Sequence, residues 1–136
     1  SFFALHALSI KVIVHLILGL PHETREMMSA SVQAIANLPV WGIKLQLLHV
    51  LSGTDLAAYY EKTHFPVFSM DEYCEMIIDC LELLPPEMVI HRITGDGPKD
   101  LLIAPMWSTG KRTVLNQIHR RLKERNTYQG RLATKR

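Results

Sequence analysis

The sequence predicts an α/β fold built around three parallel strands. Apolar runs typical of strands alternate with segments of helical periodicity, and short connections between them indicate a right-handed parallel βα array. The chain has 136 residues, 48% hydrophobic and 21% charged, which suffices for a core and excludes intrinsic disorder. A complete barrel of this type needs roughly 250 residues. The chain is therefore either a small α/β domain or the last part of a larger barrel.

The first strand is predicted over residues 10–18 (IKVIVHLIL), a nearly continuous β-branched and aliphatic run. Such runs are typical of strands covered on both faces. Gly19, Leu20 and Pro21 break the run. Apolar residues then recur at helical spacing over residues 23–37, and Pro39 ends the predicted helix.

The second strand is predicted over residues 42–50 (GIKLQLLHV), where positions 43, 45 and 47 are apolar and the other face carries Lys44, Gln46 and Leu48. A turn at 52–54 leads into a short helix over 55–62. Ser69 and Glu72 have the spacing of a capping box, which begins a helix that runs to about residue 84. Its expected inward residues are Tyr73, Met76, Ile77, Cys80 and Leu84.

The third strand is predicted over residues 87–94 (EMVIHRIT), followed by a turn at 95–98 and an irregular segment over 99–108. A basic amphipathic helix is expected over 110–125, with residues from 126 onward as a tail. We therefore expect the last βα units in residues 1–98 and a C-terminal extension in residues 99–136. The apolar line of the basic helix is Val114, Leu115, Ile118 and Leu122.

Charge is distributed unevenly along the chain. Residues 1–110 hold 6 basic and 12 acidic residues, whereas residues 111–136 hold 9 basic residues and 1 acidic residue. This asymmetry favours an acidic or nucleic-acid partner near the C-terminal end, with a solvated helix face as the alternative.

The two cysteines, Cys74 and Cys80, are too few for a disulfide framework and indicate reduced thiols in a cytoplasmic protein. Polar residues interrupt the apolar stretch over 2–20, so we expect neither a membrane span nor a signal peptide. The chain does not begin with methionine. We therefore expect it to be cut from a longer protein.

Ligands of βα folds meet the loops at the carboxyl ends of the strands. Three such loops are expected here, at 19–24, 50–54 and 94–98, and each contains glycine. In the first, Glu23 lies at the start of a helix, where a carboxylate is stabilised. Strand alternation places His15 and Ile17 toward the interior of a barrel, together with Lys44 and Gln46. An interior that accepts these two polar side chains is expected to hold a ligand.

Several segments resemble the C-terminal half of radical S-adenosylmethionine enzymes. They are residues 15–28 (HLILGLPHETREMM), 42–57 (GIKLQLLHVLSGTDLA), 91–107 (HRITGDGPKDLLIAPMW) and 116–130 (NQIHRRLKERNTYQG). The most similar branch is the Fe–S oxidoreductases related to Elp3-like and coproporphyrinogen-oxidase-like members. The resemblance implies the C-terminal portion of a partial (βα)6 TIM-type barrel, with three parallel strands and a C-terminal amphipathic helix.

The resemblance also implies site residues. The family's GxIxGxxE motif maps to His15, Ile17, Gly19 and Glu23, with Ile17 against the adenine; His15 replaces the first glycine and Glu23 lies one residue late. The next strand would add backbone contacts to the adenine. We expect the cofactor-binding set to be His15, Ile17, Gly19, Glu23, Gln46, His49, Val50 and Leu51, with Lys44, Gly53 and Thr54 on the substrate side.

The family's three cluster-binding cysteines are absent from this chain, so no metal ligand is assigned. We expect an intact parent enzyme that uses S-adenosylmethionine and a 4Fe–4S cluster to generate a 5′-deoxyadenosyl radical, and a fragment that is inactive alone and binds neither. Its expected partners are the missing N-terminal half of the barrel, a second copy through the exposed barrel edge, and tRNA, but no membrane. The nucleic-acid candidates are Lys111, Arg112, Arg120, Arg121, Lys123 and Arg125.

Two other functions are compatible with the sequence. One is a non-catalytic module that uses the basic helix to bind nucleic acid or protein. The other is a metal hydrolase, because His15, His49 and His91 fall on three successive predicted strands. No HxH pair or accompanying carboxylate supports the metal site, so hydrogen-bonded histidines are the favoured interpretation.

Overall fold

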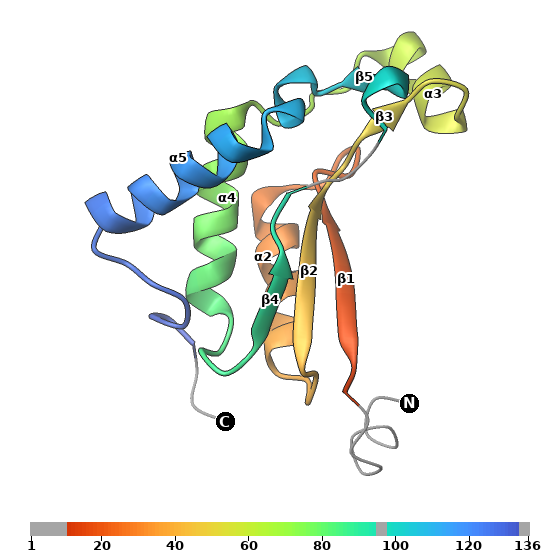
Figure 1. The fold of residues 1–136 in the computed structure, drawn as a ribbon. Helices are drawn as coiled ribbons and strands as arrows, with labels where there is room; N and C mark the ends of the chain where they lie inside the picture. The colour runs from red at the N-terminus through yellow and green to blue at the C-terminus, as the bar shows by residue number, and fades with distance from the viewer. Residues whose placement is uncertain (1–10, 95–97, 134–136) are drawn as a thin grey trace.

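Three parallel strands form the central sheet in the computed structural model, which describes residues 11–94 and 98–133. The strands are β1 (Ile13–Leu18), β2 (Gly42–Leu47) and β4 (Val89–Arg92), in the order β1-β2-β4. Figure 1 shows them side by side in the lower half of the molecule. The three predicted parallel strands are therefore confirmed, each shorter than expected.

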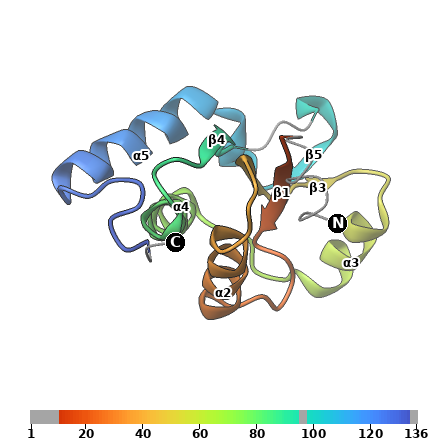
Figure 2. The same ribbon diagram turned by 90° about the horizontal axis from the view of Figure 1, so that it is seen from below.

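Two helices cover one face of this sheet. They are α2 (Arg25–Ala36) and α4 (Met70–Leu83), and α5 (Lys111–Glu124) packs against α4. Seen along the strands, α2, α4 and α5 lie to one side of the sheet (Figure 2). Among the described residues, no helix has the length and apolar character needed to cross a membrane. The core holds Leu18, Met28, Val32, Ile43, Leu45, Leu47, Tyr73, Met76, Ile77, Cys80, Leu84 and Ile118.

Local signals begin the two covering helices where the sequence predicts them. Thr24 caps α2 by accepting a hydrogen bond from the Met27 backbone. At α4, Ser69 and Glu72 form both bonds of the capping box, which satisfies two of the helix's first N–H groups. All five residues expected to point inward from α4 are buried.

The strands present opposite faces to the core and to solvent, as their alternation predicts. Leu18, Ile43 and Leu45 are fully buried under the helices. On the other face, Ile17 is 41% exposed and His15 is also exposed. No helix of the described residues covers this second face, which we call the open face (Figure 2).

A second, smaller unit lies beyond the carboxyl end of the sheet. β3 (Val50–Leu51) pairs antiparallel with β5 (Leu102–Ala104), and α3 (Asp55–Thr63) packs beside β3. Two 3-10 turns, Lys99–Leu101 and Met106–Thr109, flank β5. The prediction of one strand over 42–50 was wrong, because the chain leaves the sheet after Leu47. The segment 99–108, expected to be irregular, contains β5. A strand of only three residues is too short to show the alternation of apolar and polar residues by which strands are predicted.

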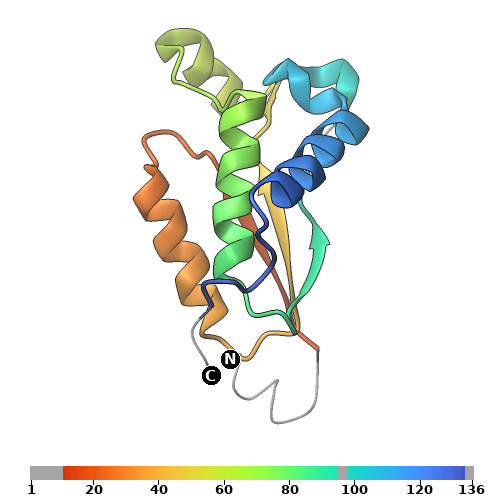
Figure 3. The ribbon, with the colours of Figure 1, turned by 90° about the vertical axis from the view of Figure 1, so that its left-hand side faces the viewer.

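The residues after α5 are not the free tail that the sequence predicts. They return to the end of α4, where Gly130 N–H binds the Leu81 carbonyl and Leu132 N–H binds the Glu82 carbonyl. Figure 3 shows this segment, residues 126–133, running down beside α4. We call it the C-terminal strap. It adds hydrogen-bond donors to carbonyls in the last turn of α4, where Leu81 also accepts from Leu84 N–H.

Candidate functional site

The open face brings together the side chains that the sequence predicts for a ligand-bearing interior. In the β1–β2 register, His15 lies opposite Lys44 and Ile17 lies opposite Gln46. Lys44 and Gln46 are half-buried, whereas His15 and Ile17 are exposed. The face thus offers an apolar side chain, an amide, an imidazole and an ammonium group on two neighbouring strands. Such a set can hold a ligand with both an aromatic and a polar part.

Gly19 makes the turn from β1 toward α2 at the carboxyl end of this face. Its φ is +90°, and a Cβ at this position would lie 3.0 Å from the Phe68 ring. A left-handed residue this close to an aromatic ring must be glycine. The Phe68 ring therefore packs directly against the backbone at the mouth of β1, in the space that a side chain would need.

The segment predicted to contact adenine after β2 is held by backbone pairing. Leu48 N–H binds the Leu18 carbonyl, which extends the β1–β2 contact beyond the strand. Val50 and Leu51 pair with Ala104 and Leu102 of β5. Val50 is fully buried, backbone included, so in this fold it presents no exposed group to a ligand, whereas Leu51 is half-buried.

Glu23 lies apart from the open face. It lines a cavity of about 430 Å³ between the start of α2 and the loop before α4, and Ile17 and Gln46 do not line it. Within the described residues, its Oε1 is buried and has no hydrogen-bond partner. A buried acceptor without a donor is costly, so the geometry leaves room for one more donor there. The lining is Gly19, Leu20, His22, Glu23, Thr24, Arg25, Met28, Pro66, Val67, Phe68 and Glu72.

The loop between β1 and α2 is held by a contact with α3 that the sequence does not predict. His22 adopts φ of +66°, and its Nε2 lies 2.9 Å from the Tyr59 hydroxyl of α3. The left-handed conformation of a non-glycine residue is the kind of local strain that a tertiary contact sustains. No spacing in the sequence links positions 22 and 59, so only the fold reveals this pair.

Gly53 and Thr54, predicted on the substrate side, begin α3. The Thr54 hydroxyl accepts a bond from Ala57 N–H and donates one to the Leu51 carbonyl. Gly53 has φ of +81° and no atom within 4 Å of an added Cβ. Both line a cavity of about 520 Å³ together with His64 and Ile103, on the side of β3 where α3 packs.

The three strand histidines have separate surroundings. His15 lies opposite Lys44, whereas the His91 ring packs against Trp41 with 5.0 Å between centroids. His49 follows the end of β2. In the part of the chain that the structure describes, no three His, Cys, Asp or Glu side chains gather as a metal site.

The two cysteines do not fit the role of cluster ligands. Cys74 and Cys80 are fully buried in α4. Burial raises the pKa of Cys80 to about 12, with the charge of Asp79 adding to the effect, and burial likewise raises the pKa of Cys74. Iron–sulfur clusters are bound by thiolates, so these protonated core thiols are unsuited to that chemistry.

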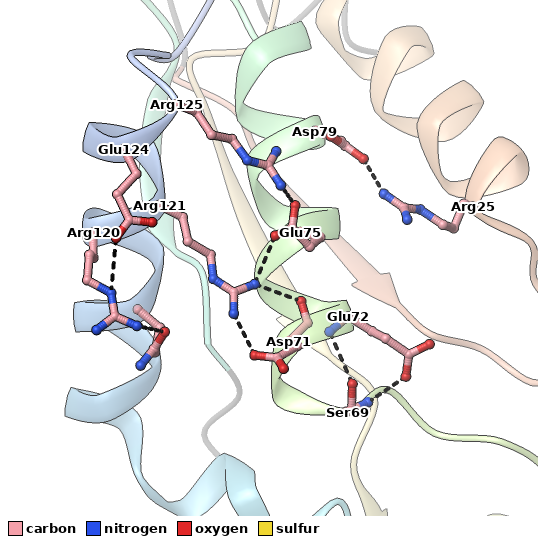
Figure 4. A network of polar contacts seen from close by, with 11 residues as sticks. Arg25, Ser69, Asp71, Glu72, Glu75, Asp79, Arg120, Arg121, Glu124 and Arg125 are labelled. Carbon is pink, nitrogen blue, oxygen red and sulfur yellow. Dashed lines mark hydrogen bonds and ion pairs between the residues drawn. The ribbon is translucent and has the colours of Figure 1, made fainter.

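The basic helix is partly neutralised by its own chain. Arg121 pairs with Asp71 at 2.5 Å and with Glu75 at 3.0 Å, and Arg125 also pairs with Glu75. Figure 4 shows these contacts between α5 and α4. Arg120 contacts Glu124 within α5 at 3.7 Å. The remaining candidates, Lys111, Arg112 and Lys123, are exposed.

Comparison with known proteins places this geometry in a family. The model of the radical SAM C-terminal domain matches residues 40–124. The matched span includes β2, α4, β4 and α5. The chain therefore belongs to the radical SAM C-terminal domain family.

The chain is also similar in sequence to three longer proteins. The chain is 50% identical over 121 residues to the uncharacterized protein YtqA of Bacillus subtilis, covering 89% of this chain and 38% of YtqA. It is 32% identical over 126 residues to the uncharacterized protein MJ0486 of Methanocaldococcus jannaschii, covering 92% and 39%. YhcC of Escherichia coli is 30% identical over 115 residues, covering 85% and 37%. The chain thus spans less than two fifths of these relatives.

A solved structure shares the fold. It is the Methanocaldococcus infernus Elp3 with an N-terminal deletion, which matches with a TM-score of 0.74 over 92% of this chain and 29% of that chain. The sequence identity is 18%. At that identity the likeness concerns the fold alone.

Proposed function

We propose that this chain forms the C-terminal part of the barrel of a radical S-adenosylmethionine oxidoreductase, with the open face toward the cofactor. The open face carries the proposal. Ile17 is 41% exposed there, beside Gln46 in the strand register. The family assignment supports a longer parent protein that would cover this face. The proposal includes the barrel itself and the division of the chain into the last βα units, residues 1–98, and a C-terminal extension, residues 99–136.

Several residues fit the cofactor. Ile17 would pack against the adenine, and the Gln46 amide would hydrogen-bond its polar edge. Gly19, which has no side chain, would let the ligand approach its backbone from the side that the Phe68 ring does not cover. When bound, S-adenosylmethionine would supply a 5′-deoxyadenosyl radical on reductive cleavage by a 4Fe–4S cluster held elsewhere in the parent. His15, His49 and Leu51 complete the proposed set at the open face. Glu23 lines a separate cavity and Val50 is fully buried, so the proposal leaves these two out.

The fragment alone would not carry out this reaction. Its two thiols are buried with raised pKa values, so a cluster would have to be bound by another part of the parent. The reduced, buried thiols also support the cytoplasm as the location. Iron and sulfide reconstitution of the fragment is expected to yield no stoichiometric cluster.

Two substitutions on β1 test the cofactor face. Ile17→Asp in a full-length relative should raise the Kd for S-adenosylmethionine, measured by equilibrium dialysis, and reduce 5′-deoxyadenosine formation in the reconstituted enzyme. Ile13→Asp is the matched control, because position 13 is on the same strand face about 13 Å away. Equal effects of both variants, or no effect of Ile17→Asp, would contradict the proposed site.

The open face also defines the proposed partner. We expect the N-terminal half of the same barrel to cover it, because an exposed apolar face and free strand edges favour association. Without that half, two copies of the fragment would associate through it. Light scattering should show a concentration-dependent dimer that Ile17→Asp abolishes; a monomer at high concentration would refute self-association.

A nucleic-acid substrate, with tRNA as the specific proposal, is supported by the exposed cations Lys111, Arg112 and Lys123 on α5. The affinity for tRNA should fall steeply with salt, because phosphate contacts release counterions. Lys123→Glu should reduce that slope, whereas Glu87→Lys, in the turn between α4 and β4, should leave it unchanged. A slope near zero would favour the alternative, a non-catalytic module that binds protein.

A further inference from the structure

The side chains of the open face lie in layers along the strands. The β1–β2 register pairs Ile17 with Gln46 near the carboxyl end and His15 with Lys44 one layer below. Successive positions on one face of a strand are about 7 Å apart, so Lys44 lies about that far beneath the layer that we propose for the adenine. Ligands of βα folds enter at the carboxyl ends of the strands. Lys44 is therefore on the side of the cofactor layer that is remote from this entrance.

Aromatic side chains occupy the amino end of the open face, below Lys44. The His91 ring fills the space over Gly42, where an added Cβ would lie 2.7 Å from His91 Cδ2. Trp41 packs against His91 with 5.0 Å between ring centroids, and Lys11 Nζ lies 4.6 Å from the centroid of the Trp41 ring. A lysine can keep its ammonium group in water by extending its side chain. Here the amino end offers rings and a second ammonium group instead.

Among the described residues, no carboxylate pairs with Lys44. The three parallel strands contain no Asp or Glu. In the register, the neighbours of Lys44 are His15 and Arg92; neither carries negative charge, and Arg92 takes part in another interaction. The ion pairs between described residues use carboxylates of α4 and α5, on the covered side of the sheet: Asp71, Glu75, Asp79, Glu82 and Glu124.

Covering the open face would remove Lys44 from water. The residue is already half-buried, and the N-terminal half of the barrel would bury the rest of it. An ammonium group buried without a counter-charge is costly. Side chains in a barrel interior meet in layers, so a carboxylate of the covering half, placed in the layer of Lys44, would supply that charge through a charge-assisted hydrogen bond.

We propose that the N-terminal half of the parent carries an Asp or Glu, facing the barrel interior, whose carboxylate pairs with Lys44 beneath the cofactor layer. The pairing rests on the proposed function, since it requires a barrel that closes over the open face. A carboxylate of the substrate or of S-adenosylmethionine is the less favoured source, because it would have to pass the layer of Ile17 and Gln46 to reach Lys44.

The first measurement asks whether Lys44 is covered in the full-length parent. The chain, kept dilute so that it stays monomeric, and the cofactor-free parent are acetylated with sulfo-NHS acetate and analysed by mass spectrometry. Lys44 should react at least about tenfold more slowly in the parent, because a covered amine reacts only when the structure opens locally. Lys123, exposed on α5, should react equally in both. Equal rates at Lys44 would overturn the pairing together with the proposed barrel.

The second measurement asks whether the covering group is an acid. Lys44→Glu should lower the melting temperature of the parent by at least about 5 °C, because it would place two carboxylates in one layer. In the chain alone, where this layer is open to water, the same change should shift the melting temperature by less than about 2 °C. Lys123→Glu is the matched control, and it should shift the melting temperature of either protein by less than about 2 °C.

A neutral variant keeps the result open to contradiction if Lys44→Glu does not fold. Lys44→Met removes the charge and keeps most of the length, so it should lower the melting temperature of the parent by leaving the carboxylate unpaired. A rise in the melting temperature would show that Lys44 is buried without a counter-charge, and would overturn the pairing. Circular dichroism checks that each variant is folded.

A charge exchange identifies the partner. Lys44→Glu is combined in turn with replacement of each Asp and Glu of the N-terminal half by Lys, and one combination should recover at least about half of the lost melting temperature. Recovery by none would overturn the pairing, and a loss seen only with S-adenosylmethionine bound would assign the counter-charge to the cofactor. Slow acetylation of Lys44 without any loss in Lys44→Glu would overturn the pairing alone and leave the proposed barrel intact.

Discussion

Thr127 donates its hydroxyl hydrogen to Oε2 of Glu82 across 2.5 Å. Arg131 donates to the same oxygen from its Nε at 2.8 Å and its Nη2 at 2.6 Å. Glu82 is only 7% exposed, so these bonds hold a nearly buried carboxylate. They fasten the C-terminal strap to the end of α4.

The carboxylate of Glu82 should make the free energy of unfolding depend on pH in the acidic range. Burial acts to raise its pKa, but hydrogen bonds from Thr127 and Arg131 and the charge of Arg131 outweigh it, so the pKa is lowered. A carboxyl with a lower pKa in the folded state stabilises above its unfolded pKa, and that contribution is lost as the pH falls through the folded pKa. The free energy of unfolding should therefore decline below about pH 4.5, the ordinary pKa of a glutamate side chain.

Urea titrations at several pH values should show a smaller decline for Glu82→Gln than for the wild type. Glu87→Gln, at an exposed position, should retain the wild-type decline; identical curves for all three proteins would contradict the prediction.

Substitutions at Gly53 and Gly130 should distinguish the cost of a left-handed backbone from the cost of a steric clash. Both have positive φ, but a Cβ on Gly130 would lie 2.5 Å from Pro86 Cγ, whereas one on Gly53 meets nothing within 4 Å. Gly53→Ala should lower the free energy of unfolding by roughly 1–2 kcal/mol through the left-handed backbone alone. Gly130→Ala should lower it further, because the strap must move away from Pro86. Denaturant unfolding of both variants measures the difference, and equal losses would show that the strap adapts freely.

Arg121 should contribute more to stability than any exposed cation of α5. Its side chain is 17% exposed, and it bonds to Glu75 and to both the carboxylate and the backbone of Asp71. Arg121→Ala should cost about 1–3 kcal/mol, because it leaves half-buried Glu75 with less compensation. Lys123→Ala should stay within about 0.5 kcal/mol. A double-mutant cycle with Glu75→Ala measures the coupling, and a coupling near zero would disprove the bridging role.

The cysteines should be inert in the folded protein. Burial raises the pKa of Cys80 to about 12, and the thiolate is the reactive form. A thiol reagent such as dithionitrobenzoate at pH 8 should label neither cysteine in native buffer, and both in guanidinium chloride. Rapid native labelling would show that α4 opens readily.

The sequence predicts the local features of this fold well, because the relevant signals are close together. The capping box at Ser69 and Glu72 sets the start of α4. The two-residue period of β2 assigns Lys44 and Gln46 to the open face. Those signals act over one helical turn or one strand.

Features that depend on distant residues were not predicted. The strap is polar, and its order comes from bonds between Thr127 and Glu82, 45 positions apart, so hydropathy gives no sign of it. The short strand β5 exists because it pairs with β3. The prediction of a nucleic-acid site does not distinguish the six cations at α5 from one another, although Asp71, Glu75 and Asp79 recur every four residues. That acidic stripe of α4 was a signal for the ion pairs of Arg121 and Arg125.

The strap also has a consequence for biosynthesis. The carbonyls of Leu81 and Glu82 receive N–H groups from Gly130 and Leu132, about fifty positions later. A nascent chain that has left the ribosome only as far as Arg125 therefore lacks two of the donors that the last turn of α4 uses. Until residues 126–132 have emerged, the Leu81 carbonyl has only its bond from Leu84 N–H, so this domain acquires its final hydrogen bonds late in synthesis.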